Sequence, residues 1–299
     1  MTLRHFLEID DLTAAELVEV LDLAEATDPP QVLAGKGGAL LFEKPSVRTR
    51  NAAEMAVVHL GGHPVAMREA EVGIDERESA EDLARVLSGF HAVIGARVFA
   101  HTTVVRMAGA AAVPVVNLLS DRAHPTQALA DVLTLRQHLG ELSGHRLAWV
   151  GDANNVFCSL SLAAAMVGME VRAACPAGFA PAADHLARVA AAGTNLTVTD
   201  RPEAAVDGAD VVATDVWTSM GQEDEAERRR QAFAGFIVDQ ALMAHAAPAA
   251  VFLHCLPAHR GEEVTGEVVD GPQSLVWLQA ENRLHALRGL LAFLLGRSG

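Results

Sequence analysis

The sequence predicts an α/β protein of two domains, each a parallel sheet flanked by helices, joined by interdomain helices. Three observations support this fold class. The chain has 299 residues, more than one average domain needs. Short apolar runs recur along it, separated by segments whose apolar residues follow a helical period. The runs are apolar throughout, as in parallel strands that are covered on both faces.

The first half of the chain contains one helix and then four predicted strands. Thr13 and Glu16 have the spacing of a capping box, so a helix is expected to begin between them. Segment 68–78 is the most charged stretch and is expected to be a loop. Strands are predicted at 39–42, 64–67, 92–96 and 113–117, with helical patterns after each of them.

The second half repeats this alternation after a polar, glycine-containing stretch at 141–144, which is a candidate domain boundary. We expect a first domain at 1–138, a second at 139–282, and a last helix at 283–299 that packs back on the first. The buried strands of the second domain are predicted at 147–150, 171–174, 196–198, 211–213 and 251–253.

Composition limits the classes of function. The formal net charge is −15, which argues against a nucleic-acid partner. No run of about 18 apolar residues predicts a membrane span. The three cysteines, Cys158, Cys175 and Cys255, lack CxxC spacing, so neither a disulfide framework nor a zinc knuckle is predicted. We expect a protein of the reducing cytoplasm.

The turn after the first predicted strand combines hydroxyl and guanidinium groups at a helix start. It contains Ser46, Arg48, Thr49 and Arg50. Helix N-termini present unpaired N–H groups and positive partial charge, so they bind phosphate readily. Arginine forks add charge-assisted hydrogen bonds to oxyanions. The turn therefore predicts a phosphate cradle. The alternative is an ordinary N-cap at Ser46 with solvated arginines.

Further candidates follow other predicted strands of the first half. Arg97 ends the strand at 92–96, and the carboxyl ends of parallel strands are where open α/β sheets bind ligands. His124 and Gln127 lie at another helix start near the same sheet edge. The alternatives are a surface arginine and an N-terminal turn histidine.

In the second half, two loops at strand ends are rich in reactive groups. One contains Asp215, and the other contains Cys255 between histidines and acidic residues. A cysteine there can act as nucleophile, proton acceptor or metal ligand, but a zinc site lacks its usual second cysteine pair. The alternative for Cys255 is a small buried hydrophobe. The turn at 151–155 lacks G-x-G-x-x-G, which weakens a nucleotide-binding interpretation.

Four motifs appear together in one order. They are Ser-x-Arg-Thr-Arg at 46–50, His-Pro-x-Gln-Ala-Leu-Ala-Asp at 124–131, Asp-Val-Trp-Thr-Ser-Met-Gly at 215–221 and His-Cys-Leu-Pro at 254–257. With them the chain resembles the aspartate/ornithine carbamoyltransferase family from about residue 40 to residue 294. The first two motifs mark any member, whereas the last two point to its ornithine-specific branch.

The resemblance implies transfer of a carbamoyl group from carbamoyl phosphate to L-ornithine, giving L-citrulline in arginine biosynthesis. It implies no metal or cofactor, and a homotrimer or a multiple of trimers. Carried over by motif, the residues that hold carbamoyl phosphate are Ser46, Val47, Arg48, Thr49, Arg97 and His124, with Gln127 and Arg283 beside them. L-Ornithine is held by Asn155, Asp215, Ser219 and Met220, while Cys255 and the backbone carbonyl of Leu256 face the reacting amine.

The chain departs from the family pattern at three places. Val47 replaces a threonine, and Ala53 replaces a phenylalanine. Segment 71–78 lacks the glutamine or histidine that relatives extend into a neighbouring subunit, so either another residue such as Arg77 substitutes or that contact is lost. Three alternatives therefore stay open: a carbamoyltransferase for an acylated ornithine or a diamine, a non-catalytic carbamoyl-phosphate-binding paralogue, and a nucleotide-binding oxidoreductase.

Overall fold

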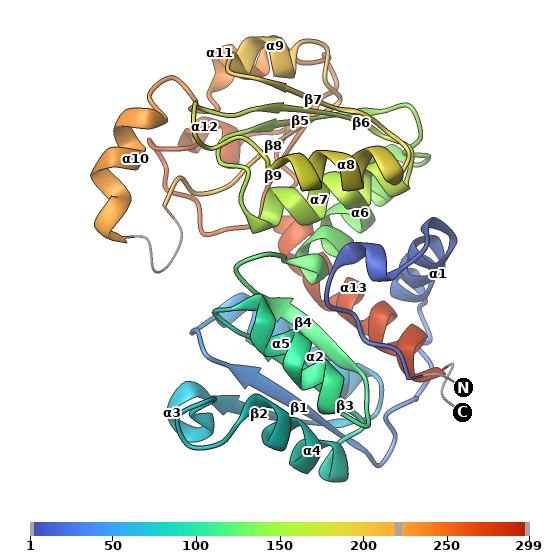
Figure 1. Cartoon of the computed structure of the whole chain (residues 1–299). Coiled ribbons are helices and arrows are strands. Elements are labelled where there is room, and N and C mark those ends of the chain that lie inside the picture. Colours follow the sequence, from blue (N-terminus) through green and yellow to red (C-terminus); the bar gives the residue numbers. More distant parts are fainter. Residues whose placement is uncertain (1–2, 219–222, 297–299) are drawn as a thin grey trace. The chain divides into compact units, whose positions relative to one another are not determined.

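The computed structural model describes residues 3–218 and 223–296 and confirms the predicted fold class (Figure 1). Its strands form two all-parallel sheets, one of four strands and one of five. The chain divides into two compact units: the first comprises Met1–Leu133 and Glu281–Gly299, and the second Thr134–Ala280. Helices α6 (Pro125–Leu139) and α13 (Val276–Gly296) contain the two division points.

The sheet of the first unit has the strand order β2-β1-β3-β4. The strands are β1 (Gly37–Phe42), β2 (His63–Arg68), β3 (Val93–Arg97) and β4 (Val115–Leu119), each at a predicted position. β1, β3 and β4 are almost fully buried, which explains their uninterrupted apolar sequences. Phe42 and Arg97 are partners in the register of β1 and β3, so these two strands end side by side.

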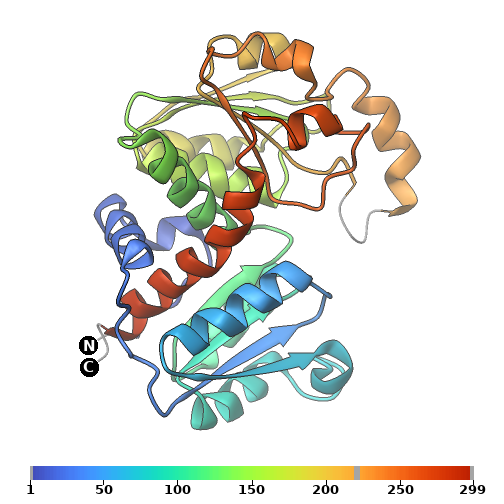
Figure 2. The ribbon, with the colours of Figure 1, turned by 180° about the vertical axis from the view of Figure 1, so that it is seen from behind.

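Helices cover both faces of this sheet. α4 (Ala80–Phe90) and α5 (His101–Ala110) pack on one face through Leu83, Leu87, Val104 and Met107. α2 (Val47–His59) lies over the other face, as Figure 2 shows. Segment 68–78, expected to be a loop, contains a one-turn helix, α3 (Glu69–Val72).

The C-terminal part of α13 packs against α1 (Ala14–Glu25) in the same unit. The predicted capping box of α1 is present: the Thr13 side chain accepts from the Glu16 N–H, and the Glu16 carboxylate accepts from the Thr13 N–H. A Cβ added at Gly289 would lie 2.5 Å from the Val20 carbonyl oxygen, so only glycine permits this close approach. Arg288 Nη2 donates to the carbonyl oxygen of Ala26 at 2.9 Å, which satisfies a carbonyl at the end of α1.

The sheet of the second unit has the order β7-β6-β5-β8-β9. Its strands are β5 (Arg146–Val150), β6 (Glu170–Ala174), β7 (Leu196–Thr199), β8 (Val211–Thr214) and β9 (Val251–His254), again at the predicted positions. α7 (Asn155–Met166) and α8 (Ala183–Ala191) lie on one face of the sheet, as Figure 1 shows. The apolar core of the other face includes residues of α9 (Pro202–Val206), α10 (Ala226–Ala232), α11 (Gln240–Met243) and α12 (Gly266–Val269).

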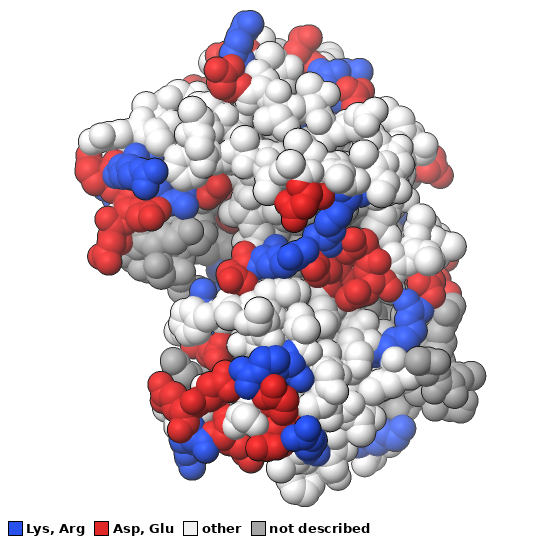
Figure 3. All heavy atoms as spheres, in the orientation of Figure 1, with Lys and Arg blue, Asp and Glu red and all other residues white. Residues whose placement is uncertain are grey.

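Acidic side chains gather over α3 and the segment after it, as Figure 3 shows. Exposed members of this patch include Glu71, Asp75, Glu76, Glu78 and Asp82. A surface of this charge repels a phosphate backbone, so it agrees with the argument against a nucleic-acid partner. Among the described residues, no helix combines the length and apolar character that crossing a bilayer requires.

Candidate active site

The carboxyl ends of β1, β3 and β4 bring together the predicted residues of the first unit. Ser46 lies in the turn that follows β1, Arg97 is the last residue of β3, and His124 lies in the turn that follows β4. Because these strands are parallel neighbours, their carboxyl ends share one edge of the sheet. Residues that are far apart in the chain therefore contribute to one cluster.

Thr49 is the centre of this cluster. Its side chain is nearly fully buried, and its Oγ1 lies 3.5 Å from Arg97 Nη1 and 3.1 Å from Arg283 Nη2, both of which donate to it. Ser46 caps α2, since its Oγ accepts from the Thr49 N–H at 3.3 Å. One hydroxyl oxygen thus connects an arginine of β3 with an arginine of α13, and the N-cap fixes where that hydroxyl lies.

The predicted cradle and the predicted N-cap are both present, but in different residues. Ser46 caps the helix, while Arg48 is half-buried and lies close enough to influence the charge of His124. Arg50 instead forms an i,i+4 ion pair with Glu54 at 2.7 Å. Val47 is 79% exposed, so only its backbone N–H can contribute to an anion site.

Gln127 extends the network on α6. Its Oε1 accepts from Arg283 Nη1, and its Nε2 donates to Asp131 Oδ1 at 2.7 Å. Both Gln127 and Asp131 are buried. The amide therefore has a fixed orientation, with its oxygen toward the arginine and its nitrogen toward the carboxylate.

His124 lies in a positive environment. It is 4% exposed. Burial lowers the pKa of His124 well below its usual value, and the positive charges of Arg283, Arg97 and Arg48 lower it further. The imidazole is consequently neutral at pH 7, and one of its nitrogens is a hydrogen-bond donor. The same positive charges favour an anionic ligand.

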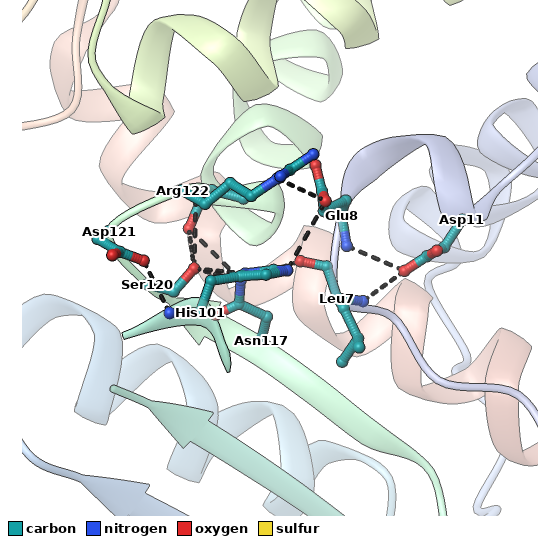
Figure 4. Close-up of polar contacts among 9 residues, drawn as sticks. Leu7, Glu8, Asp11, His101, Asn117, Ser120, Asp121 and Arg122 are labelled. Carbon is teal, nitrogen blue, oxygen red and sulfur yellow. Dashed lines mark hydrogen bonds and ion pairs between the residues drawn. The ribbon is translucent and has the colours of Figure 1, made fainter. Parts of the chain in front are cut away.

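A polar network anchors the turn that leads to His124 (Figure 4). The Asn117 Nδ2 group donates to the Leu7 carbonyl oxygen at 2.9 Å and to Ser120 Oγ at 3.1 Å. His101 Nδ1 lies 2.8 Å from the same hydroxyl, and Arg122 Nε pairs with Glu8 Oε1 at 3.0 Å. The N-terminal segment thereby holds the turn in place. Sequence patterns did not indicate this network, because its members are separated by more than a hundred residues.

The second unit repeats the arrangement at the ends of β5, β8 and β9, which are also parallel neighbours. Asn154 lies in the turn after β5, Asp215 directly follows β8, and Cys255 directly follows β9. The Asp215 carboxylate joins the other two: Oδ1 accepts from Cys255 Sγ at 3.2 Å, and Oδ2 accepts from Asn154 Nδ2 at 2.8 Å. Asp215 itself is buried.

Asn154 holds this carboxylate while also capping α7. Its Oδ1 accepts from the Val156 and Phe157 N–H groups at 3.0 and 3.1 Å, so its Nδ2 must face Asp215. The motif indicated Asn155, which begins α7 and is half-buried, and did not indicate Asn154. An asparagine just before a predicted helix was the available signal. Two other predicted residues, Ser219 and Met220, lie outside the described residues.

The backbone at Leu256 has an uncommon conformation. Its φ is +59°, in the left-handed region, which costs a residue other than glycine about 1–3 kcal/mol unless its surroundings impose it. The Leu256–Pro257 peptide bond is cis. The Leu256 N–H donates to Nδ1 of His254 at 2.9 Å, and this hydrogen bond fixes the turn immediately after Cys255.

A buried arginine, Arg229, supports the segment after Asp215. Its Nη1 donates to Asp152 Oδ2 at 2.7 Å and to the Trp217 carbonyl oxygen at 2.8 Å. Burial raises the pKa of Asp152 and outweighs the opposing effect of this arginine. Arg229 lies in a stretch so rich in charge that sequence alone does not distinguish it from its exposed neighbours, Arg228 and Arg230.

Asp215, His254 and Cys255 place possible metal-ligand atoms within 4.8 Å of one another. The imidazole is nevertheless unsuitable as a ligand, because both of its nitrogens are engaged: Nδ1 with the Leu256 N–H and Nε2 with Glu263. The remaining carboxylate and thiol face each other instead. This donor set therefore favours positioning of a polar or cationic group over tight coordination of a metal ion.

Comparisons with known proteins agree with this division of the chain. The family model for the carbamoyl-P binding domain of aspartate/ornithine carbamoyltransferases matches residues 4–137, and the model for the Asp/Orn binding domain matches residues 143–294. The ornithine carbamoyltransferase of Acidothermus cellulolyticus is 50% identical over 306 residues, covering 99% of this chain and 98% of that protein. The solved ornithine carbamoyltransferase of Pyrococcus furiosus is 44% identical with a TM-score of 0.94, covering 98% and 97%.

The neutral state of His124 predicts a specific pH dependence of stability. Its folded-state pKa is lowered, so below the unfolded-state value of about 6.5 the unfolded chain binds the extra proton first. The free energy of unfolding should therefore fall with pH below 6.5, with a His124 contribution of up to about 1.4 kcal/mol per pH unit. Urea unfolding of the wild type and His124→Asn between pH 7 and 5 measures it. Equal slopes in the two proteins would contradict the prediction.

Proposed function

The chain belongs to the aspartate/ornithine carbamoyltransferase family, and we propose that it transfers the carbamoyl group of carbamoyl phosphate to the side-chain amine of L-ornithine. The products are L-citrulline and phosphate. The observation that carries the proposal is the pair of clusters: arginines around Thr49 in one unit, and Asp215 with Cys255 in the other. We further propose a role in arginine biosynthesis, in the cytoplasm, as a homotrimer or a multiple of trimers.

The first cluster suits an acyl phosphate. We assign residues 1–138, with helix 283–299, to carbamoyl phosphate and 139–282 to ornithine. The phosphate contacts come from the start of α2 and from two arginines: the N–H groups after the Ser46 cap, Arg48 and Arg97. Gln127 and Arg283 position Thr49 and the bound substrate from the side. Several donors that strengthen their contacts as the phosphate gains charge favour its departure.

The carbonyl oxygen of the carbamoyl group becomes negative when the amine attacks. Thr49, Arg97 and His124 are the donors we assign to it. A neutral imidazole serves this purpose well, because it donates a hydrogen bond without transferring its proton, and the lowered pKa of His124 keeps it neutral. The new C–N bond then forms fully as the C–O bond to phosphate breaks, and the phosphate leaves with the electron pair.

The second cluster suits an amino acid with a cationic side chain. The amine of ornithine has a lysine-like pKa of about 10, yet only the neutral amine attacks. We assign Asp215, Cys255 and the Leu256 carbonyl oxygen to this amine, with Asn155, Ser219 and Met220 as further ligands of the amino acid. Asp215 attracts the ammonium group, and with Cys255 it orients the amine and assists loss of its proton.

A citrulline assay with a panel of amines tests the activity. L-Ornithine should be carbamoylated at a much higher kcat/KM than N-acetyl-L-ornithine or putrescine, because an acylated or absent α-amino group removes contacts of the amino-acid end. Preference for another amine would indicate the alternative carbamoyltransferase. Binding of carbamoyl phosphate without turnover of any amine would indicate a non-catalytic paralogue.

Arg97→Ala should lower turnover by about 10²–10³, the usual effect of losing one oxyanion donor. Arg85→Ala is the matched control, since it removes an exposed arginine of the same unit that pairs with Asp82. Steady-state kinetics on both variants measure the difference. A turnover near that of the control would remove Arg97 from the assigned machinery.

Cys255→Ala and Asp215→Asn should lower kcat/KM for ornithine and shift its pH profile, because each removes a group that positions the amine and assists its deprotonation. The control is Cys175→Ala in the same unit. Burial raises the pKa of the Cys175 thiol to about 12, so this cysteine is unreactive at neutral pH. Kinetics between pH 6 and 10 test the role, and unchanged profiles in both variants would reject it.

A further inference from the structure

A buried pair, His254 and Glu263, closes the turn that presents Cys255 and Leu256. His254 Nε2 lies 3.1 Å from Glu263 Oε1, and both side chains are fully buried. The same carboxylate oxygen accepts from the His259 N–H at 2.6 Å. The backbone of His254 is held as well, since its N–H donates to Gln279 Oε1 at 3.0 Å. Glu263 thus fastens the turn at its far end and in its middle.

The hydrogen bonds of this pair determine where the imidazole proton resides. The Leu256 N–H can only donate, so His254 Nδ1 must be the unprotonated nitrogen that accepts from it. The proton is therefore on Nε2 and points to Glu263 Oε1. Protonation of both nitrogens would place two donors, Nδ1–H and the Leu256 N–H, against each other. The arrangement requires a neutral imidazole and an accepting carboxylate oxygen.

We propose that His254 and Glu263 act as a positioning pair for the amine-binding turn: Glu263 fixes the orientation of the imidazole, and Nδ1 of His254 holds Leu256 in its left-handed conformation. The inference rests on the proposed function, because it is the Cys255 thiol and the Leu256 carbonyl oxygen that we assign to the attacking amine. Neither member of the pair is a catalytic residue, since a fully buried side chain does not touch substrate.

The chain of contacts explains why the effect reaches the chemistry. Cys255 lies between the two residues that this hydrogen bond connects, so the direction of its Sγ toward Asp215 depends on the turn. Leu256 directs its carbonyl oxygen according to the same backbone angles. Loss of the pair therefore misplaces two groups together, and a displacement of about 1 Å is enough to lower a rate by about 10²-fold.

Matched substitutions at both positions separate the two hydrogen bonds. Glu263→Gln keeps an oxygen acceptor for His254 Nε2–H and the His259 N–H, so its kinetics should stay close to wild type. Glu263→Ala removes that acceptor and should lower kcat/KM for ornithine about tenfold to a hundredfold. His254→Asn retains an acceptor near the position of Nδ1 and should be milder than His254→Gln, which does not.

The control and the readout distinguish positioning from a merely structural role. Arg260→Ala alters the same loop by removing an exposed ion pair with Asp270, and it should keep wild-type kinetics. Assays are made well below every melting temperature, with both substrates varied. The pair should affect kcat and KM for ornithine and leave KM for carbamoyl phosphate unchanged. Folded Glu263→Ala with the kinetics of Arg260→Ala overturns the proposal; if that variant does not fold, His254→Gln is judged by the same criterion.

A second measurement needs no activity. In ¹⁵N-histidine-labelled wild type at pH 7, two-bond ¹⁵N–¹H correlations should show His254 with its proton on Nε2, and His254→Asn identifies the signals. A proton on Nδ1, or on both nitrogens, overturns the proposal. If the wild type forms no citrulline, the proposed function fails while this spectrum still decides the arrangement of the pair.

Discussion

Parallel pairing of neighbouring strands is the constraint on which the chemistry of this protein depends. In each unit three adjacent strands, β1-β3-β4 and β5-β8-β9, end at one edge of a sheet. The residues that follow them in the chain are separated by tens of positions, yet they meet because strand direction leaves no other place for them. Thr49 with Arg97, and Asp215 with Cys255, are both consequences of that register.

Placing several cations in a buried cluster is costly unless neutral acceptors receive their donors. Thr49 Oγ1 and Gln127 Oε1 do this for Arg97 and Arg283 without cancelling their charge. A carboxylate in the same place would form tighter pairs and leave less attraction for a phosphate. His124 reflects the remaining positive field directly, because the arginines and burial act on its pKa in the same direction. The cluster is thus arranged for an anion before the anion arrives.

The predictable parts of the structure are those encoded in contiguous residues. All nine described strands lie at predicted positions, because strands covered on both faces are apolar throughout. Arg97 and His124 were found by reasoning from strand ends. Arg229 and Glu263 were not, since a charged residue that will be buried has the same local pattern as one that stays exposed. Their burial depends on partners at positions 152 and 254, which only the folded chain brings near.

Asn154 shows how one residue type can be selected by two constraints at once. Serine, threonine or aspartate at this position would cap α7 through an acceptor oxygen just as asparagine does. None of them has an N–H group to offer the carboxylate of Asp215, and an aspartate would add a like charge beside it. Ser46 faces no such demand, because the group next to its helix, Thr49, contributes its own hydroxyl. The two N-caps therefore differ because one site is built around arginines and the other around a carboxylate.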